Sequence, residues 1–310
     1  MGRFPFRSRR DWETRLREGL VTQGNKPLQP GDRLLLHPPL QFLAPSFCEP
    51  AVPDETVILK QTEEYALVYK PAPLPVHPGG RYNKNTLLAI LREKPDQHGI
   101  SGGHRWGPYS PTTPENLWTV HRLDAVTSGL MVFGRCAVFS RKIQKAFAAG
   151  RIRKYYLAVV RGCPAVDRIT IDKPVRRKTG FVFETADQGK ASSTEIEVLL
   201  RGDKASLVKC IPHTGRTHQI RLHLHEWGHP VIDDPVYGLP GKRTPRESDD
   251  DNPRNFFKSP IQNTGISLLH YRIQSQDPPL DGNLFDYFEN PGIPSERLHP
   301  LKSPSYPKLP

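Results

Sequence analysis

Three side chains that lie far apart in the sequence could together perform chemistry on a planar ligand. Asp124 closes a short segment that begins with His121 and Arg122, and Tyr156 and Arg221 follow much later. If the three meet, the guanidinium would keep the carboxylate ionised and orient it. The tyrosine ring would offer a stacking surface for a planar group such as a nucleobase. Such a site could carry out nucleophilic carboxylate chemistry on a nucleotide without a metal or a cofactor.

Asp124 also has a simpler interpretation as a carboxylate that caps a turn. Thr127, Ser128 and Gly129 precede the apolar run 130–133, and small polar residues before an apolar strand favour a tight turn at a sheet edge. A side chain just ahead of that turn would lie at the mouth of whatever cleft the sheet borders. Spacing in the sequence leaves both interpretations open.

The other two side chains need a strand and a helix to position them. The β-branched and aromatic residues of 154–160 predict a strand, with Tyr156 on the same face as Ala158 and Val160. The spacing of apolar residues predicts a helix over 217–227, with Arg221 on a face other than the apolar one.

Strands outnumber helices in the rest of the chain, and many of the strands form hairpins. Further strands are expected at 34–36, 57–59, 66–69, 129–133, 194–200, 205–211 and 267–273, and further helices at 11–18, 86–94 and 136–149. This order favours an α+β fold with a mixed, mostly antiparallel sheet and flanking helices.

Composition indicates a polyanionic partner. The chain has 310 residues, with 44 Lys and Arg against 32 Asp and Glu, a formal net charge of +12. This length fits one large domain with appendages, and the charge makes nucleic acid the first candidate. Charge alone does not separate RNA from DNA or from an anionic membrane surface.

The cysteines indicate a reducing compartment. The four of them are scattered, without a Cys-x-x-Cys pair, which is typical of free thiols. Apolar runs stay well short of the roughly 18 residues that a membrane span needs. We therefore expect a cytoplasmic protein without a membrane partner, and a monomer without an obligatory protein partner.

A basic stretch runs from Arg135 to Lys154 and contains no Asp or Glu. A charge run of this kind is often a solvated helix face. Beside a candidate active site, an unbroken field of one sign is better explained by phosphate contacts. Arg151, Arg153 and Lys154 are the candidate contacts at its end.

The segment His121–Leu130 resembles the signature of the RluA-type RNA pseudouridine synthases. Other motifs of that family follow in the same order, and several ordered motifs are more specific than one. They are Lys70–Pro78, Lys154–Ala158, Thr214–Arg221, Gly228–Pro230, Asp234–Gly238 and Leu268–His270.

This resemblance implies a pseudouridine synthase fold with a central RNA-binding cleft, and isomerisation of uridine to pseudouridine without a cofactor. Asp124 falls on the aspartate that forms a covalent adduct. Tyr156 falls on the tyrosine that stacks on the target base and helps to remove its carbon-5 proton. Arg221 falls on the arginine that pairs with the aspartate. Arg122 falls on the residue that fills the space of the flipped uridine.

Three other motif residues, His121, Arg216 and His218, receive scaffold or phosphate-binding roles from the resemblance. The domain organisation that we predict is a partial small RNA-binding domain at 1–40, a linker at 41–56, a catalytic domain at 57–275 with insertion loops at 95–116 and 239–260, and a Pro-rich tail at 276–310.

Two other functions are compatible with parts of the sequence. The histidines between 213 and 229 could suggest a zinc hydrolase, but no His-Glu-x-x-His motif occurs. A non-catalytic RNA-binding protein could keep the fold, yet a chain that had lost the reaction should have lost Asp124, Tyr156 or Arg221. As substrates, tRNA and rRNA both remain open.

Overall fold

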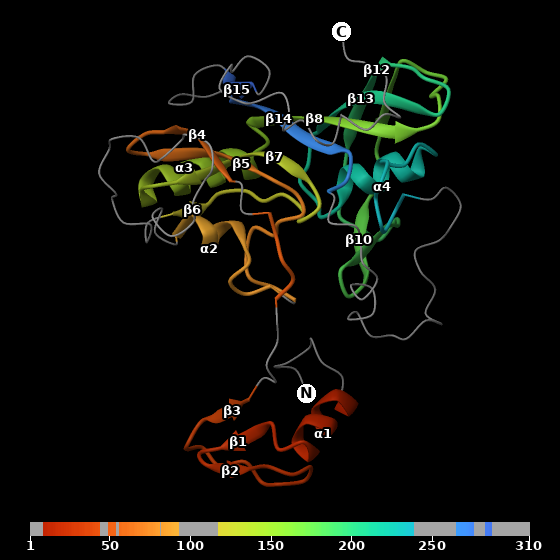
Figure 1. Cartoon of the computed structure of the whole chain (residues 1–310). Helices are drawn as coiled ribbons and strands as arrows, with labels where there is room; N and C mark the ends of the chain where they lie inside the picture. Colours follow the sequence, from red (N-terminus) through yellow and green to blue (C-terminus); the bar gives the residue numbers. More distant parts are fainter. Residues whose placement is uncertain are drawn as a thin grey trace. The chain divides into compact units, whose positions relative to one another are not determined.

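The computed structural model describes residues 9–43, 49–53, 56–80, 82–92, 117–238, 265–275 and 283–286. The chain divides into two compact units, Met1–Glu49 and Pro50–Pro310 (Figure 1). The expected insertion loops 95–116 and 239–260 lie outside the described residues, as does most of the Pro-rich tail.

The first unit combines one helix with a small antiparallel sheet. Helix α1 spans Arg9–Arg17 and precedes β1 (Val21–Gln23), β2 (Lys26–Pro27) and β3 (Leu40–Phe42), which are arranged in the order β2-β1-β3. Most of strand β3 falls in the stretch 41–56 that was expected to be a linker. It pairs with β1 and so belongs to the small sheet of the first unit.

The strand predicted at 34–36 is wrong. Its backbone groups bond to a side chain instead of a neighbouring strand: the Gln23 amide accepts from Leu35 N–H at 3.0 Å and donates to the Leu35 carbonyl at 2.7 Å. The apolar run Leu34–Leu36 is exposed, with Leu36 at 95%. Three consecutive leucines look like a strand, but here none of them has a core to face.

The second unit is built on a ten-stranded sheet whose main path is β4-β5-β7-β14-β8-β13-β12-β9, with β6 on β7 and β15 on β14. Only β7 and β14 run parallel among the pairs described, so the sheet is mixed and mostly antiparallel, as predicted. Its strands are β4 (Val57–Gln61), β5 (Tyr65–Lys70), β6 (Trp118–Thr119), β7 (Ser128–Gly134), β8 (Ile152–Arg161), β9 (Arg168–Ile171), β12 (Thr194–Leu200), β13 (Ala205–Pro212), β14 (Leu268–Ser275) and β15 (Asn283–Asp286).

Helices cover both faces of this sheet. Leucines of α2 (Leu87–Arg92) and Ile220 of α4 (Gln219–Glu226) join one apolar cluster with Tyr156 of β8. Helix α3 (Ala137–Ala148) packs into a second cluster on the opposite face, which receives the alternate residues of β5 and β7. The sheet alternation predicted around Tyr156 is therefore correct.

Residues 161–193 contain strands that the sequence analysis did not identify. Besides β9, they form a separate antiparallel pair of β10 (Val175–Thr179) and β11 (Val182–Thr185). Strands β10 and β11 are short and their polar residues do not alternate with apolar ones, so periodicity gives little signal there. Strand β9 does alternate over its four residues, and this pattern could have identified it. Within the described part of the chain, no helix has the length and apolar content to cross a membrane.

Candidate active site

The three predicted catalytic side chains line one cavity of about 420 Å³. Asp124 belongs to the loop before β7, Tyr156 to β8 and Arg221 to α4. Strand β14 lies between β7 and β8, so these elements are neighbours neither in the sequence nor in the sheet. Only the tertiary fold brings the three side chains together.

The loop that carries Asp124 is held through its backbone. Thr127 N–H donates to the Asp124 carbonyl at 3.1 Å, and Leu74 N–H donates to the Ala125 carbonyl at 2.8 Å. Gly129 follows with φ +126°, and a β-carbon there would lie 2.3 Å from the His270 carbonyl oxygen of β14. The close approach of β14 thus requires glycine where β7 begins, and it determines where the Asp124 loop enters the sheet.

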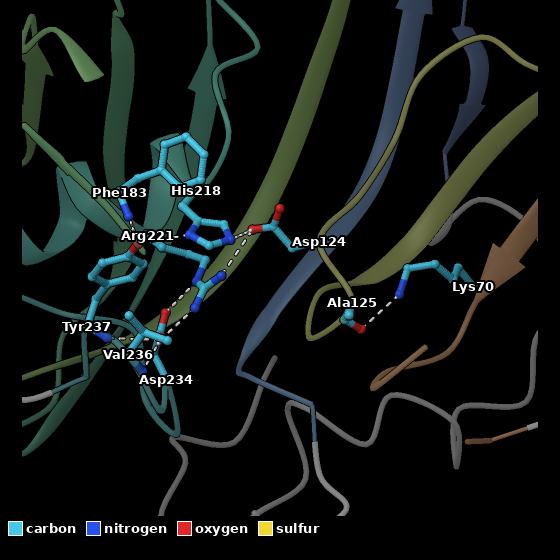
Figure 2. Close-up of polar contacts among 9 residues, drawn as sticks. All are labelled: Lys70, Asp124, Ala125, Phe183, His218, Arg221, Asp234, Val236 and Tyr237. Carbon is cyan, nitrogen blue, oxygen red and sulfur yellow. Dashed lines mark hydrogen bonds and ion pairs between the residues drawn. The ribbon is translucent and has the colours of Figure 1, made fainter. Parts of the chain in front are cut away.

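A buried lysine anchors the same loop, and its role was not recognised in the sequence. Lys70, at the end of β5, is fully buried, and its Nζ donates to the carbonyls of Pro71 (3.0 Å) and Leu74 (2.8 Å). The same Nζ donates to the Ala125 carbonyl at 3.1 Å (Figure 2). An ammonium has three N–H donors, which match these acceptors. Burial lowers the pKa of Lys70 to about 7, and nearby Asp124 acts in the opposite direction.

Arg221 is shared between two carboxylates. Its Nη1 donates to Asp124 Oδ2 at 3.2 Å, while Nε and Nη2 donate to the two oxygens of Asp234 at 2.6 and 2.8 Å (Figure 2). The pairing with Asp124 agrees with the sequence prediction. The stronger, two-pronged pairing with Asp234 was missed, although Asp234 lies in a motif that the resemblance had singled out.

Both members of the buried pair are ionised. Burial opposes the charge on Arg221, but the Asp234 carboxylate outweighs it and raises the net pKa. Burial likewise opposes the charge on Asp234, and Arg221 together with the backbone N–H groups of Val236 and Tyr237 lowers its pKa. Asp234 therefore holds the guanidinium in place before any substrate arrives, and Arg221 presents its remaining edge to Asp124.

Tyr156 presents its ring from the floor of the cavity. One face of the ring stacks on His270 of β14, with centroids 4.5 Å apart and planes inclined by 19°. Burial, and then Asp124, raises the pKa of Tyr156, so the ring is a neutral phenol at neutral pH. His270 bonds to the Leu130 carbonyl at 2.7 Å, and burial lowers its pKa to about 3.

His218 and Tyr237 complete the wall around Arg221. His218 Nε2 lies 3.9 Å from Asp124 Oδ2, and its Nδ1 lies 2.8 Å from the Tyr237 hydroxyl. The Arg221 guanidinium lies over the Tyr237 ring, 4.9 Å from its centroid. Burial lowers the pKa of His218 to about 4, although Asp124 opposes the shift.

Residues 64–226 match the family model described as RNA pseudouridylate synthase, which is more than half of the chain. The chain belongs to the RNA pseudouridylate synthase family. The resemblance to its RluA-type members is thereby confirmed.

Named relatives agree with this assignment. An RNA pseudouridine synthase of Aquifex aeolicus is 34% identical over 79% of this chain and 77% of its own length. Human pseudouridylate synthase RPUSD2 is 32% identical over 73% of this chain, and RNA pseudouridine synthase 7 of Arabidopsis thaliana is 34% identical over 61%. The matches span 39% and 46% of those two longer relatives, so the chain covers less than half of each.

Solved structures confirm the fold. The structure of human RNA pseudouridylate synthase domain containing 1 superposes with a TM-score of 0.53 at 22% identity, covering 74% of this chain and 82% of that one. Human RNA pseudouridylate synthase domain containing 4 gives 0.52 at the same identity, covering 78% and 92%. The pseudouridine synthase fold predicted from the sequence is correct.

The residues predicted to bind RNA do not all lie at the cavity of this family member. Arg122 and Arg216 are exposed and line it, and Lys154 lines it from β8. Arg151 and Arg153 are exposed but do not line it. Arg153 is one residue from Lys154 on the strand, so its side chain points to the opposite face of the sheet.

His121 lines the cavity but is built into the scaffold. Its Nε2 accepts from Val132 N–H at 2.9 Å, and its ring lies 4.8 Å from that of Phe147. Burial lowers its pKa well below the ordinary value, so it carries no charge with which to bind phosphate at neutral pH.

The histidines of the zinc interpretation are engaged in separate contacts. His223 bonds to Thr194 and to the Lys173 carbonyl, His225 to the Tyr237 carbonyl, and His229 to the Arg161 carbonyl. Among the described residues, no three His, Cys, Asp or Glu side chains are grouped so that they could hold a metal ion.

Proposed function

We propose that this protein isomerises specific uridines of structured RNA to pseudouridine, with Asp124 as the nucleophile. The observation that carries the proposal is the contact of 3.2 Å between Asp124 and Arg221 in a cavity that Tyr156 also lines. Membership of the RNA pseudouridylate synthase family and the names of the relatives support it.

The two oxygens of Asp124 have different surroundings. Arg221 Nη1 and His218 Nε2 both approach Oδ2, and no described residue donates a hydrogen bond to Oδ1. In the proposed reaction Oδ1 attacks the sugar or the base and forms a covalent adduct. The N1–C1′ bond breaks, the uracil turns, and a C1′–C5 bond forms. The bond between Oδ1 and the sugar or base breaks in the same sequence, with its electron pair returning to Oδ1, so the Asp124 carboxylate is restored. C5 loses a proton and N1 gains one, so the product is an isomer and no cofactor is needed.

Tyr156 is proposed to hold the uracil by stacking. One face of its ring stacks on His270, and the side chain lines the cavity. The raised pKa favours this neutral stacking role over that of an ionised base in the free protein. Removal of the C5 proton by Tyr156, which the family resemblance implies, would require the bound substrate to assist it.

Access to Asp124 requires the uridine to leave its stack, which costs a few kcal/mol. Arg122 is exposed at the rim, two residues before Asp124, where it could occupy the vacated space. Arg216 and Lys154 border the same cavity and are proposed to contact phosphates.

The test is a map of pseudouridines formed on unmodified tRNA and rRNA. RNA is incubated with wild-type protein and with Asp124→Asn, then labelled with carbodiimide and read by reverse-transcription stops. Asp124→Asn keeps the side-chain shape, and Arg221 keeps its bonds to Asp234, so folding and RNA binding should persist while turnover is abolished.

New stops with wild type alone would support the isomerisation and the role of Asp124 as the nucleophile. The RNA that carries the stops would show whether the substrate is tRNA or rRNA. Turnover by Asp124→Asn would contradict the assignment of Asp124 as the nucleophile. Tight binding without stops on any RNA would favour a non-catalytic RNA-binding protein.

A further inference from the structure

His218 adopts a backbone conformation that residues with side chains rarely adopt. It immediately precedes α4 and has φ 59° and ψ 15°, in the left-handed region. Such strain persists where the surrounding structure imposes it, and it gathers at functional sites. The residue at this position usually caps the helix with its side chain, but His218 makes no capping bond. Its side chain makes its contacts outside the helix terminus.

The imidazole is held between two aromatic rings. Its plane stands at 70° to the ring of Phe183 and at 67° to that of Tyr237, with centroids 5.2 and 5.6 Å away. Its Nδ1 is bonded to the Tyr237 hydroxyl at 2.8 Å. The edge that bears Nε2 borders the active-site cavity and faces Asp124 (Figure 2).

The hydrogen bonds around Tyr237 favour one tautomer of His218. Phe183 N–H donates to the Tyr237 oxygen at 3.0 Å, so the single hydroxyl hydrogen of Tyr237 is available to His218 Nδ1. The pKa of Tyr237 is raised by burial to about 12, which keeps this hydrogen in place. Burial favours the neutral form of His218, and a neutral imidazole whose Nδ1 accepts the Tyr237 hydrogen carries its ring proton on Nε2.

We propose that His218 is a positioning residue for the reaction: its Nε2–H, oriented by the Tyr237 hydroxyl, donates to Oδ2 of Asp124 and turns Oδ1 toward the uridine. The separation of 3.9 Å closes to a hydrogen bond when substrate enters, since contacts of this kind tighten in the reacting complex. This inference rests on the proposed function, because it assumes that Asp124 is the nucleophile.

A neutral donor suits this position better than a second cation. The charged groups around His218 are Asp124 and Arg122 from the loop before β7, Arg221 on α4 and Asp234 from the segment after α4. Arg221 already balances the Asp124 carboxylate. An imidazolium beside it would stabilise the carboxylate further and weaken it as a nucleophile, whereas a neutral N–H orients the carboxylate without adding charge.

Two substitutions of His218 distinguish the effect of losing the N–H donor from the effect of losing the imidazole ring. In His218→Gln the amide nitrogen reaches approximately to the position of Nε2, whereas in His218→Asn it reaches only to that of Nδ1. Asn is also well tolerated in the left-handed region, so His218→Asn should unfold at a concentration of urea no lower than wild type. Single-turnover rates at saturating RNA, together with KM, are measured for both variants.

The rate of His218→Asn should fall about 10- to 100-fold, the effect of one hydrogen bond to a charged group, with KM little changed. His218→Gln should recover to within about fivefold of wild type. A wild-type rate in His218→Asn, or equal losses in both variants, would overturn the proposal, since shape rather than the donor would then matter.

A second readout does not depend on turnover. Long-range proton–nitrogen NMR spectra of the whole protein distinguish the two neutral tautomers, and the signal that disappears in His218→Asn assigns His218. We expect a proton on Nε2 in wild type and a mixture of tautomers in Tyr237→Phe. A proton on Nδ1 would overturn the proposal. Absence of pseudouridine with the expected tautomer would instead reject the proposed function, and with it the role of His218 in that reaction.

Discussion

The two sides of the cavity hold their charged groups in different ways. On one side, the Asp124 loop (residues 121–128) is anchored by its backbone, and the Asp124 side chain keeps 18% of its surface exposed. On the other, the Arg221 wall (α4 with residues 234–238) holds Arg221 and Asp234 by side-chain bonds, with 3% and 0% exposed. The group proposed to react remains reachable while the group that balances its charge is immobilised.

This difference has a physical reason. The reacting oxygen of a nucleophile must exchange contacts with the substrate, so bonds to that oxygen would have to be broken first. A buried guanidinium is stable only when its donors are satisfied, and Asp234 satisfies Nε and Nη2 without using Asp124. Substitutions on either side of the cavity test this difference, and their expected effects on stability and turnover differ in size.

The largest effect is expected from Asp234→Ala, which breaks the Arg221 wall. It leaves a buried guanidinium paired with Asp124 alone, and loss of one partner of a buried ion pair costs about 3–5 kcal/mol. The free energy of unfolding, measured with urea, should fall by that amount, and turnover should fall as Arg221 draws Asp124 away from the substrate.

Asp233→Asn serves as the control, because Asp233 is exposed and has a positive φ that Asn tolerates. A loss below about 1 kcal/mol for Asp234→Ala would show that the wall does not depend on this pair.

Lys70→Met should break the Asp124 loop. Met is an unbranched apolar side chain one atom shorter than Lys. The change leaves buried carbonyls without a donor, including that of Ala125, at about 1–3 kcal/mol for an unsatisfied group. We expect a loss of that order in the free energy of unfolding and a lower rate, because Asp124 is no longer held in place. Lys60→Met is the matched control, because Lys60 is an exposed residue of β4. Equal unfolding curves for the two variants would contradict the anchoring role.

The two sides should also differ in the pH at which they affect stability. A Lys or His whose pKa is lower in the folded state binds its proton more readily when unfolded, so stability rises with pH between the folded and the ordinary pKa. For Lys70 that window is about pH 7 to 10.5, and for His218 about pH 4 to 6.5. Each contributes at most about 1.4 kcal/mol per pH unit.

Unfolding free energies measured across both windows test this assignment. Lys70→Met should reduce the slope in the alkaline window alone, where Lys154 also contributes because burial lowers its pKa. His218→Asn should reduce the slope in the acid window, where His121 and His270 also contribute because burial lowers their pKa values. If Lys70→Met changed the slope in the acid window, or His218→Asn the slope in the alkaline window, the two sides of the cavity would not be independent.

The smallest effects are expected from substitution of the two exposed arginines that line the cavity, Arg122 and Arg216, which are proposed to contact RNA. Binding should weaken steeply with added salt, because phosphate contacts release counterions. Arg122→Ala and Arg216→Ala should each reduce the slope of log affinity against log salt by about 1. Arg153→Ala should leave the slope unchanged, since Arg153 does not line the cavity. A larger effect of Arg153→Ala would place the RNA on the opposite face of the sheet.

Much of this architecture could be predicted from local pattern. Alternation along β8 put Tyr156 on the face that lines the cavity, and it could also have excluded Arg153, which is adjacent to Lys154 on the strand. The spacing of Phe139 and Ile143 identified α3, and both residues are buried. The strand expected at 34–36 failed because an apolar run carries no information about whether a partner strand exists, and the Gln23 side chain takes its backbone groups instead.

The sequence by itself determined the family, the strand that carries Tyr156 and the helix that carries Arg221, because these depend on contiguous motifs and on periodicity. Only the tertiary structure decided which groups meet. The insertion of β14 between β7 and β8, the burial of Lys70 beneath Ala125, the second carboxylate on Arg221 and the bond between His218 and Tyr237 all depend on contacts between distant segments. Burial, charge and tautomer are properties of such contacts, and residue order along the chain does not specify them.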